Sequence, residues 1–244
     1  MVNCPNDDTG SCCGKCHFNP VVVIATHNRV EVTKKNIEHL QNQRCKIVLV
    51  VSREDEEQYF KNLFPEIIVT LFSNNPLGAK WQHGVDEARK LNADPMIIVG
   101  SDDYLSSDYI DRCLNHILKG WELIGTTHWH TYNPNYDLLY KMRYTNQNIS
   151  FPIGSGKCFS KSLLDRMRWK VFNGMLSRKL DDQGYNNALR VNARICLDND
   201  LTVLAVKGEW KAMNKLEDYL MSRNIKSVLI EDTTILKEIY NYVL

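Results

Sequence analysis

Short apolar runs that recur at regular intervals constrain the fold of this 244-residue chain more than any other feature. Four such runs, rich in β-branched residues, occur in the first hundred residues, at 21–25, 46–51, 67–71 and 96–99. Continuous apolar runs of this length are typical of strands buried on both faces. The intervening segments predict helices, at 30–43, 53–64 and 77–91. Strands that alternate with helices predict a doubly wound α/β fold with a mostly parallel sheet.

The second half of the chain has a less regular pattern. It predicts helices at 107–119, 160–167 and 182–191. It also predicts strands at 121–126, 138–144 and 201–206, and then a helix, a strand at 228–230 and a last helix. We find no internal repeat and no long linker. The sequence therefore predicts one α/β domain over residues 20–244, preceded by a short cysteine-rich leader over residues 1–19.

The charge balance excludes a general affinity for polyanions. Lysine and arginine number 30 against 29 aspartate and glutamate, which gives a net charge of +1. A balanced chain has no bulk attraction to nucleic acid or to an anionic membrane. The longest apolar runs are far shorter than the roughly 20 residues that a membrane helix needs. With no recognisable secretion signal at the start of the sequence, we expect a cytoplasmic protein without a membrane span.

Four cysteines crowd the leader, namely Cys4, Cys12, Cys13 and Cys16. Cys13 and Cys16 have the spacing that lets two thiolates bind one zinc ion, and Cys4 with Cys12 or His17 could complete a tetrahedron. The alternative is a polar leader whose thiols bind nothing, and we favour it because a single C-x-x-C pair is a weak signal.

Two adjacent carboxylates, Asp102 and Asp103, follow the fourth apolar run. In a doubly wound sheet, ligands bind beyond the carboxyl ends of the strands. Paired carboxylates are costly there unless a cation or a hydrogen-bond network balances them. A divalent metal that carries a diphosphate would supply such a cation, because hard cations prefer oxygen ligands. The alternative is that Asp102 caps a turn and Asp103 lies at the start of the next helix.

Three segments carry a resemblance to a known family, at 21–29, 73–84 and 99–103. Their residues, order and spacing resemble the GT-A glycosyltransferases of the family 2 type, over about residues 21–191. The resemblance implies a GT-A (Rossmann-like) sheet flanked by helices, with a nucleotide-sugar half at about 20–105 and an acceptor half at about 106–244. It also implies a nucleotide-sugar donor, with a UDP-sugar favoured, and a Mn²⁺ or Mg²⁺ cofactor.

The resemblance also implies roles for individual residues. Asp103 and Asp102 would bind the metal, and Asp102 would approach the ribose or the phosphate. Lys80 would reach the diphosphate. The other residues implied at the nucleotide sugar are Thr26, Asn28, Arg29, Ser52, Gly154 and Gly156.

The sequence departs from the family at three positions. Ser101 stands where the family often has its first acidic residue. Ser52 stands in place of an aspartate that binds uracil or ribose, a role for which Glu54 or Asp55 could substitute. Lys207 lies where many relatives have a metal-binding histidine; it could neutralise phosphate directly, although we favour a surface charge.

A second acidic pair, Asp181 and Asp182, precedes the helix predicted at 182–191. The family has its catalytic base in such a pair, downstream of a glycine-rich segment. We favour Asp182 as the base with Asp181 beside it, and the reverse order stays open. The alternative is that the pair caps the helix, a role that aspartate fills well.

These observations predict an inverting, metal-assisted glycosyltransferase that moves a sugar from a nucleotide diphosphate to a hydroxyl. The acceptor would be a glycan or another hydroxyl-bearing molecule, and basic residues at 166–179 leave modified DNA open. One alternative is a nucleotidyltransferase that makes nucleotide-sugars. Another is a non-catalytic carbohydrate- or nucleic-acid-binding module on the same fold.

Overall fold

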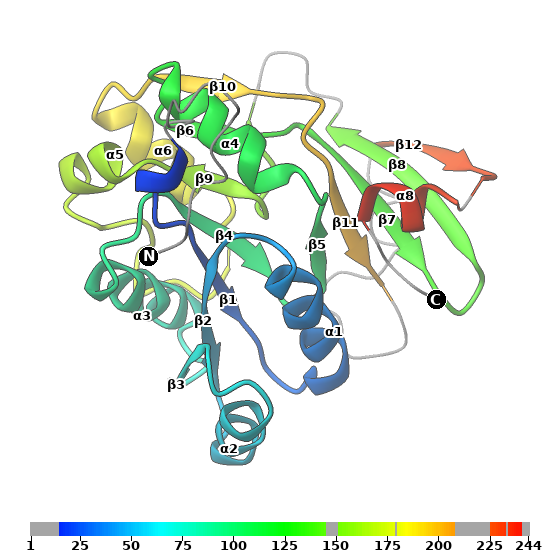
Figure 1. Cartoon of the computed structure of the whole chain (residues 1–244), viewed down its shortest axis with the longest axis horizontal. Helices are drawn as coiled ribbons and strands as arrows, with labels where there is room; N and C mark the ends of the chain where they lie inside the picture. The colour runs from blue at the N-terminus through cyan, green and yellow to red at the C-terminus, as the bar shows by residue number, and fades with distance from the viewer. Residues whose placement is uncertain (1–14, 145–150, 179, 208–224, 233, 241–244) are drawn as a thin grey trace, which may run out of the picture.

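The four apolar runs form four adjacent strands of a seven-stranded sheet in the computed structural model (Figure 1), which describes residues 15–144, 151–178, 180–207, 225–232 and 234–240. The strand order is β10-β6-β9-β4-β1-β2-β3. Strands β1 to β4 run parallel, and β9 is antiparallel to both of its neighbours. The bounds are β1 (Val21–Ala25), β2 (Lys46–Val51), β3 (Ile68–Leu71), β4 (Met96–Gly100), β6 (Leu123–Gly125), β9 (Lys157–Phe159) and β10 (Ile195–Leu197). The mostly parallel α/β sheet is confirmed.

Helices cover both faces of this sheet. The helices of the described residues are the short 3-10 turn η1 (Lys15–His17), α1 (Val30–Gln41), α2 (Glu54–Leu63), α3 (Leu77–Lys90), α4 (Tyr109–Leu118), α5 (Lys161–Arg166), α6 (Gln183–Arg190) and α8 (Ile235–Tyr240). From α1 to α6, each lies within a few residues of the helix that the sequence predicts there. Helix α8 is the last helix, predicted without bounds, and no helix is predicted at η1.

Strand β1 shows why its apolar run is continuous. Val22 and Ile24 pack in one hydrophobic cluster with α1, and Val21 and Val23 pack in another with α3. Both faces are therefore buried, and no polar residue is tolerated on either side. Gly84 lets α3 approach closely, because a Cβ there would lie 2.5 Å from a Val23 methyl group.

A second sheet of five strands, in the order β12-β8-β7-β11-β5, lies beside the first. Its strands are β5 (Asp103–Leu105), β7 (His128–Asn133), β8 (Leu138–Tyr144), β11 (Val203–Val206) and β12 (Ile225–Ile230). The sequence does not predict β5 or β7, because β5 is very short and β7 is a mostly polar run. The turn between β4 and β5 joins the two sheets and contains Asp102.

Several predictions fall on residues that lie outside the described ranges. Cys4, Cys12 and Cys13 lie in 1–14, and the helix predicted before the last strand lies in 208–224. The separate leader over residues 1–19 and the division into two halves therefore stay predictions. No helix in the described part of the chain is both long and apolar enough to cross a membrane.

Candidate active site

The carboxyl ends of the parallel strands bring the predicted site residues to one edge of the large sheet. Thr26 follows β1 and Ser52 follows β2, and the two acidic residues follow β4. The Thr26 hydroxyl, however, faces α1, where it lies 2.8 Å from the Thr33 hydroxyl. The edge therefore forms as predicted, but not every predicted side chain faces outward from it.

Asp102 is buried and held between two cations. Its Oδ1 accepts a hydrogen bond from Arg29 Nη1 at 3.1 Å, and its Oδ2 accepts one from Lys207 Nζ at 2.7 Å. Lys207 is itself only 8% exposed, so our preference for a surface charge at this position is wrong. The end of β11 carries Lys207 to this carboxylate, because the Val206 amide donates to the Asp102 carbonyl at 2.8 Å. Both oxygens of Asp102 are thus engaged within the protein.

Asp103 has different surroundings, although it is the next residue. It lines a pocket, and its carboxylate folds back against Gly100, where a Cβ would lie 2.2 Å from Oδ2. Burial, and then the charge of Asp102, raises the pKa of Asp103 to about 6, while Lys207, Ser155 and Arg29 act in the opposite direction. None of the ion pairs between described residues includes Asp103. Its carboxylate therefore faces the pocket without a directly paired cation.

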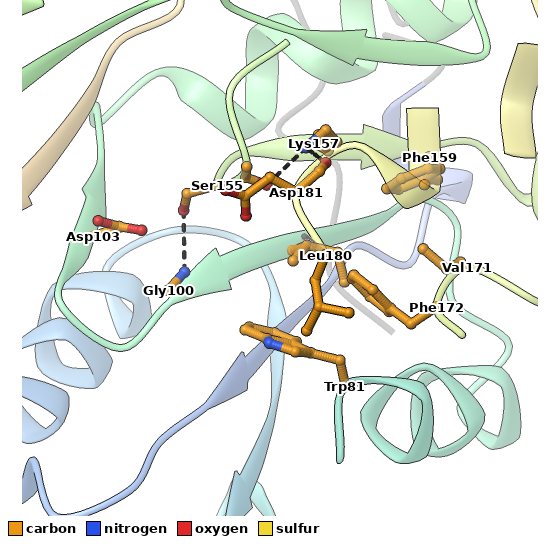
Figure 2. Close-up of a pocket in the computed structure, with 13 residues that line it drawn as sticks. Trp81, Gly100, Asp103, Ser155, Lys157, Phe159, Val171, Phe172, Leu180 and Asp181 are labelled. Atoms are coloured by element: carbon orange, nitrogen blue, oxygen red, sulfur yellow. Dashed lines mark hydrogen bonds between the residues drawn. The ribbon is translucent and has the colours of Figure 1, made fainter. Parts of the chain in front are cut away.

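The pocket lies between the ends of β4 and β9, the start of α6 and one face of α3 (Figure 2), and its volume is about 100 Å³. Its polar lining includes Asp103, Ser155, Lys157 and Asp181. Its apolar lining consists of Trp81, Ile98, Phe159, Val171, Phe172 and Leu180, and glycines complete it at Gly100, Gly154 and Gly184.

Only one member of the second acidic pair lines this pocket. Asp181 lines the pocket, and Asp182 is the exposed N-cap residue of α6 and is absent from the described lining. Gly154 allows Asp181 to approach, because a Cβ there would lie 2.5 Å from its Oδ1. The geometry thus favours Asp181 over Asp182 as the pocket carboxylate, which is the reverse of the order that we preferred from the sequence.

The glycine-rich segment is fixed to the end of β4. The Gly156 amide donates to the Ile98 carbonyl at 2.7 Å, and the Ser155 hydroxyl accepts from the Gly100 amide at 3.1 Å. Gly156 has a φ of +81°, a left-handed conformation that favours glycine. Lys157 Nζ donates to the carbonyls of Gly154 and Asp181, and this contact ties the segment to the start of α6. Burial lowers the pKa of Lys157 to about 8.

Lys80 is fully buried in α3. Its ammonium donates to the Thr26 carbonyl, to the Ser52 hydroxyl and, at 3.3 Å, to Asn74 Oδ1. Burial lowers the pKa of Lys80 to about 7, and the charge of Glu56 opposes this shift. The contacts join the ends of β1 and β2 to the loop before α3. Direct contact between Lys80 and a diphosphate stays a prediction.

Sequence reasoning missed Glu56, which is 3% exposed. Its carboxylate accepts from the Asn28 amide at 2.7 Å and from the Ser52 amide at 3.4 Å, and so links the loops after β1 and β2. Asn28 has a φ of +56°, which places its amide toward Glu56. Glu54 and Asp55, which could substitute for the family's aspartate after the second strand, are both exposed. The signal that could have identified Glu56 is its place one helical turn after Ser52.

The oxygen donors at the pocket suit a hard divalent cation only in part. Asp103 supplies a carboxylate of the type that Mg²⁺ and Mn²⁺ prefer, and a diphosphate could supply further oxygens. Asp102 fits less well as a second ligand because Arg29 and Lys207 already hold both of its oxygens. The described residues contain no group of three His, Cys, Asp or Glu that could hold a metal, and zinc at the leader gains no support from them.

Comparison with known families gives a match over much of the chain. The model of the family described as "Glycosyl transferase family 2" matches residues 21–168, which is more than half of the chain and includes β1 to β4, Asp102 and Asp103. The two aspartates before α6 lie beyond the matched residues. No curated protein matches the sequence.

Solved structures resemble this chain at low sequence identity, and one of them has a TM-score above 0.5. The crystal structure of GalNAc-T7 with UDP, GalNAc and Mn²⁺ is 11% identical with a TM-score of 0.56, and the match covers 80% of this chain but only 45% of that one. A 4-diphosphocytidyl-2C-methyl-D-erythritol synthase from Anaerococcus prevotii is 13% identical, with a TM-score of 0.49 and coverage of 82% and 90%. A CMP:2-keto-3-deoxy-manno-octonic acid synthetase with CTP is 9% identical, with a TM-score of 0.45 and coverage of 77% and 90%.

Proposed function

This chain belongs to glycosyl transferase family 2, and from that premise we propose that it transfers a sugar from a UDP-sugar to an acceptor hydroxyl. The observation that carries this proposal is the pocket between Asp103 and Asp181 at the carboxyl edge of the sheet. One carboxylate follows a central strand, where ligands of doubly wound sheets bind. The other comes from a different part of the chain, so the two can act on opposite ends of one reacting group.

In the proposed reaction Asp181 acts as the general base. It removes the proton from the acceptor hydroxyl while the hydroxyl oxygen attacks C1 of the sugar, and the bond between C1 and the diphosphate oxygen breaks. Attack from the face opposite the leaving group inverts the configuration at C1. The UDP that leaves carries the negative charge of the broken bond. General base catalysis of this kind contributes about 10²- to 10⁴-fold to the rate.

Cationic groups near Asp103 would stabilise the leaving diphosphate. A Mg²⁺ or Mn²⁺ ion held by Asp103 would supply positive charge to the diphosphate oxygens. Asp102 holds Arg29 and Lys207 in fixed positions next to this carboxylate. Fixed charges aimed at the developing negative charge need no rearrangement during the reaction, which is why they are effective.

Donor binding and UDP release test this function directly. We expect UDP-glucose at about one hundred times its Kd to stabilise the full chain by about 2.7 kcal/mol. For a domain of this size that corresponds to a rise in Tm of roughly 5–10 °C. The chain should also release UDP slowly when water replaces the acceptor, and Mn²⁺ or Mg²⁺ should increase both signals.

A matched reaction separates this function from nucleotidyl transfer. The chain is mixed with UTP and glucose 1-phosphate, and the release of pyrophosphate is followed. We expect none above background. Release of pyrophosphate together with formation of UDP-glucose would replace the proposal with nucleotide-sugar synthesis. An unchanged Tm with every UDP-sugar, with and without Mn²⁺, would contradict the proposal.

A further inference from the structure

The pocket has an apolar end that the proposed chemistry does not use. Trp81 on α3 and Phe172 stack on each other with ring centroids 5.8 Å apart and an interplanar angle of 30°. Figure 2 shows them with Leu180 on one side of the pocket, and Ser155, Lys157 and Asp181 on the other. Aromatic faces are well suited to pack against the C–H groups of a sugar ring.

The segment that carries Phe172 is fixed to α3 by the residue next to Trp81. Gln82 Oε1 accepts from the amides of Val171 and Phe172, both at 3.1 Å. Its Nε2 donates to the Trp169 carbonyl at 2.7 Å. Gln82 is only 8% exposed, so these three hydrogen bonds are shielded from water. The backbone of residues 169–172 therefore cannot move away from α3 without the loss of buried hydrogen bonds, which is costly.

The start of α3 is fixed to the same segment. The Gly78 amide donates to the Leu176 carbonyl at 2.7 Å. The backbones are so close that a Cβ on Gly78 would lie 2.2 Å from the Asn173 carbonyl oxygen. The backbones of helix α3 and of residues 169–176 are thus joined at two places, and together they form one wall of the pocket.

This pocket is small for a sugar. Its volume is about 100 Å³, whereas an engineered cavity of about 150 Å³ in another protein holds one benzene molecule. A six-membered sugar ring can therefore enter only in part, with the rest exposed at the mouth. A bulky substituent on the enclosed side of the ring would collide with the wall.

We propose that Trp81 is a specificity-determining residue that restricts the donor to sugars without an N-acetyl group. This inference rests on the proposed function. If C1 lies between Asp103 and Asp181, the ring attached to C1 extends into the pocket that these two residues line, toward Trp81 and Phe172. The indole then packs on the ring and occupies the volume that an acetamido group would need.

Calorimetric titration of the full chain with UDP-glucose and with UDP-N-acetylglucosamine tests the inference, because the two donors differ by one substituent. We expect the wild-type chain to bind UDP-glucose at least about tenfold more tightly. Trp81→Ala should bind UDP-N-acetylglucosamine more tightly than the wild type does. Its preference for UDP-glucose over UDP-N-acetylglucosamine should fall to within about threefold. Trp81→Phe, which keeps a ring, should retain most of the preference.

Tyr59→Ala is the matched control, since Tyr59 is a partly exposed aromatic residue on α2 and does not line the pocket. It should leave the preference unchanged. Equal affinities for both donors in the wild-type chain, or an unchanged preference in Trp81→Ala, would overturn the inference and leave the proposed function intact. If neither donor binds, the proposed function fails and the inference fails with it. If Trp81→Ala does not fold, Phe172→Ala replaces it in the test. The inference then requires that Phe172→Ala reduce the preference for UDP-glucose over UDP-N-acetylglucosamine.

Discussion

Two pairs of adjacent aspartates contribute to the pocket, and their surroundings differ. The pair after β4 is largely buried, with Asp102 held by Arg29 and Lys207. The pair before α6, Asp181 and Asp182, is exposed. In both pairs only one member lines the pocket, namely Asp103 in the first and Asp181 in the second.

The difference shows how one kind of sequence signal can serve two purposes. Asp102 balances buried cations and so contributes to the structure of the site, whereas Asp182 lies at a helix start in water, where an acidic residue is favoured at little cost. Asp102 and Asp182 do not line the pocket, and we expect their substitutions to differ mainly in their effect on stability. Substitutions of Asp103 and Asp181, which line the pocket, should differ from these in their effect on turnover.

The largest effect should come from Asp181→Asn. The asparagine side chain keeps the shape of the carboxylate but cannot take the proton from the acceptor hydroxyl. We therefore expect the rate of sugar transfer to fall about 10³-fold, with donor affinity nearly unchanged. Asp182→Asn is the neighbouring control and should stay within about threefold of the wild type. Single-turnover kinetics with UDP-glucose and calorimetry measure the two quantities. The assignment is reversed if Asp182→Asn is the variant that loses turnover.

The second comparison is between Asp102→Asn and Asp103→Asn in stability. Removal of the Asp102 charge takes a counter-charge from two largely buried cations, so we expect the free energy of unfolding to fall by about 3 kcal/mol. Asp103→Asn removes a carboxylate whose charged form is disfavoured by burial and by Asp102, so this variant should be at least as stable as the wild type at pH 7. Urea unfolding at pH 7 measures both. Equal losses would contradict the contrast between the two residues.

Gly154→Ala tests the approach of Asp181 to the pocket. The added methyl group would lie 2.5 Å from the Asp181 Oδ1, so the carboxylate must move. We expect the transfer rate to fall by about 10- to 100-fold, because a small displacement of a catalytic group is sufficient for that. Since Asp181 is exposed and can move, Tm should change little. Gly174→Ala is a suitable control, because a Cβ there has only ordinary contacts of 3.7 Å.

The pH dependence of stability should also separate Asp103 from its neighbour. The pKa of Asp103 rises from 3.8 to about 6 on folding, so the folded chain binds more protons than the unfolded chain between these values. The contribution of Asp103 to stability therefore falls as the pH rises from about 4 to 6, and is lowest above 6. Subtracting the Asp103→Asn curve from the wild-type curve, both from urea unfolding at pH 4–7, should give a falling difference. A flat or rising difference would be inconsistent with the raised pKa.

Much of the large sheet could be predicted because its strands carry a local signal. Strands buried on both faces need continuous apolar runs, and β1 and β2 have the bounds that the sequence predicts. Strand β9 had no such signal, because its three residues follow a glycine-rich segment that resembles a loop. It enters the sheet through its neighbours β4 and β6, and pairing with distant strands cannot be read from a local pattern.

The site could be predicted to the level of segments rather than side chains. Asp102–Asp103 and Asp181–Asp182 are recognisable as acidic pairs, and the family resemblance linked them. Which member faces the pocket depends on Lys207, more than a hundred residues away, and on the close approach of Gly154. Glu56 was missed for a similar reason, since its two partners belong to different loops.

The sequence by itself determined the order of strands and helices, the family, and the two acidic segments, because these follow from local periodicity and from motifs. The tertiary structure decided the second sheet, the burial of Lys207, which aspartates line the pocket, and the position of that pocket beside Trp81. Each of these depends on the distance between residues far apart in the chain. Such distances arise only when the two sheets and α3 pack together, and they set which charges are buried and which face the pocket.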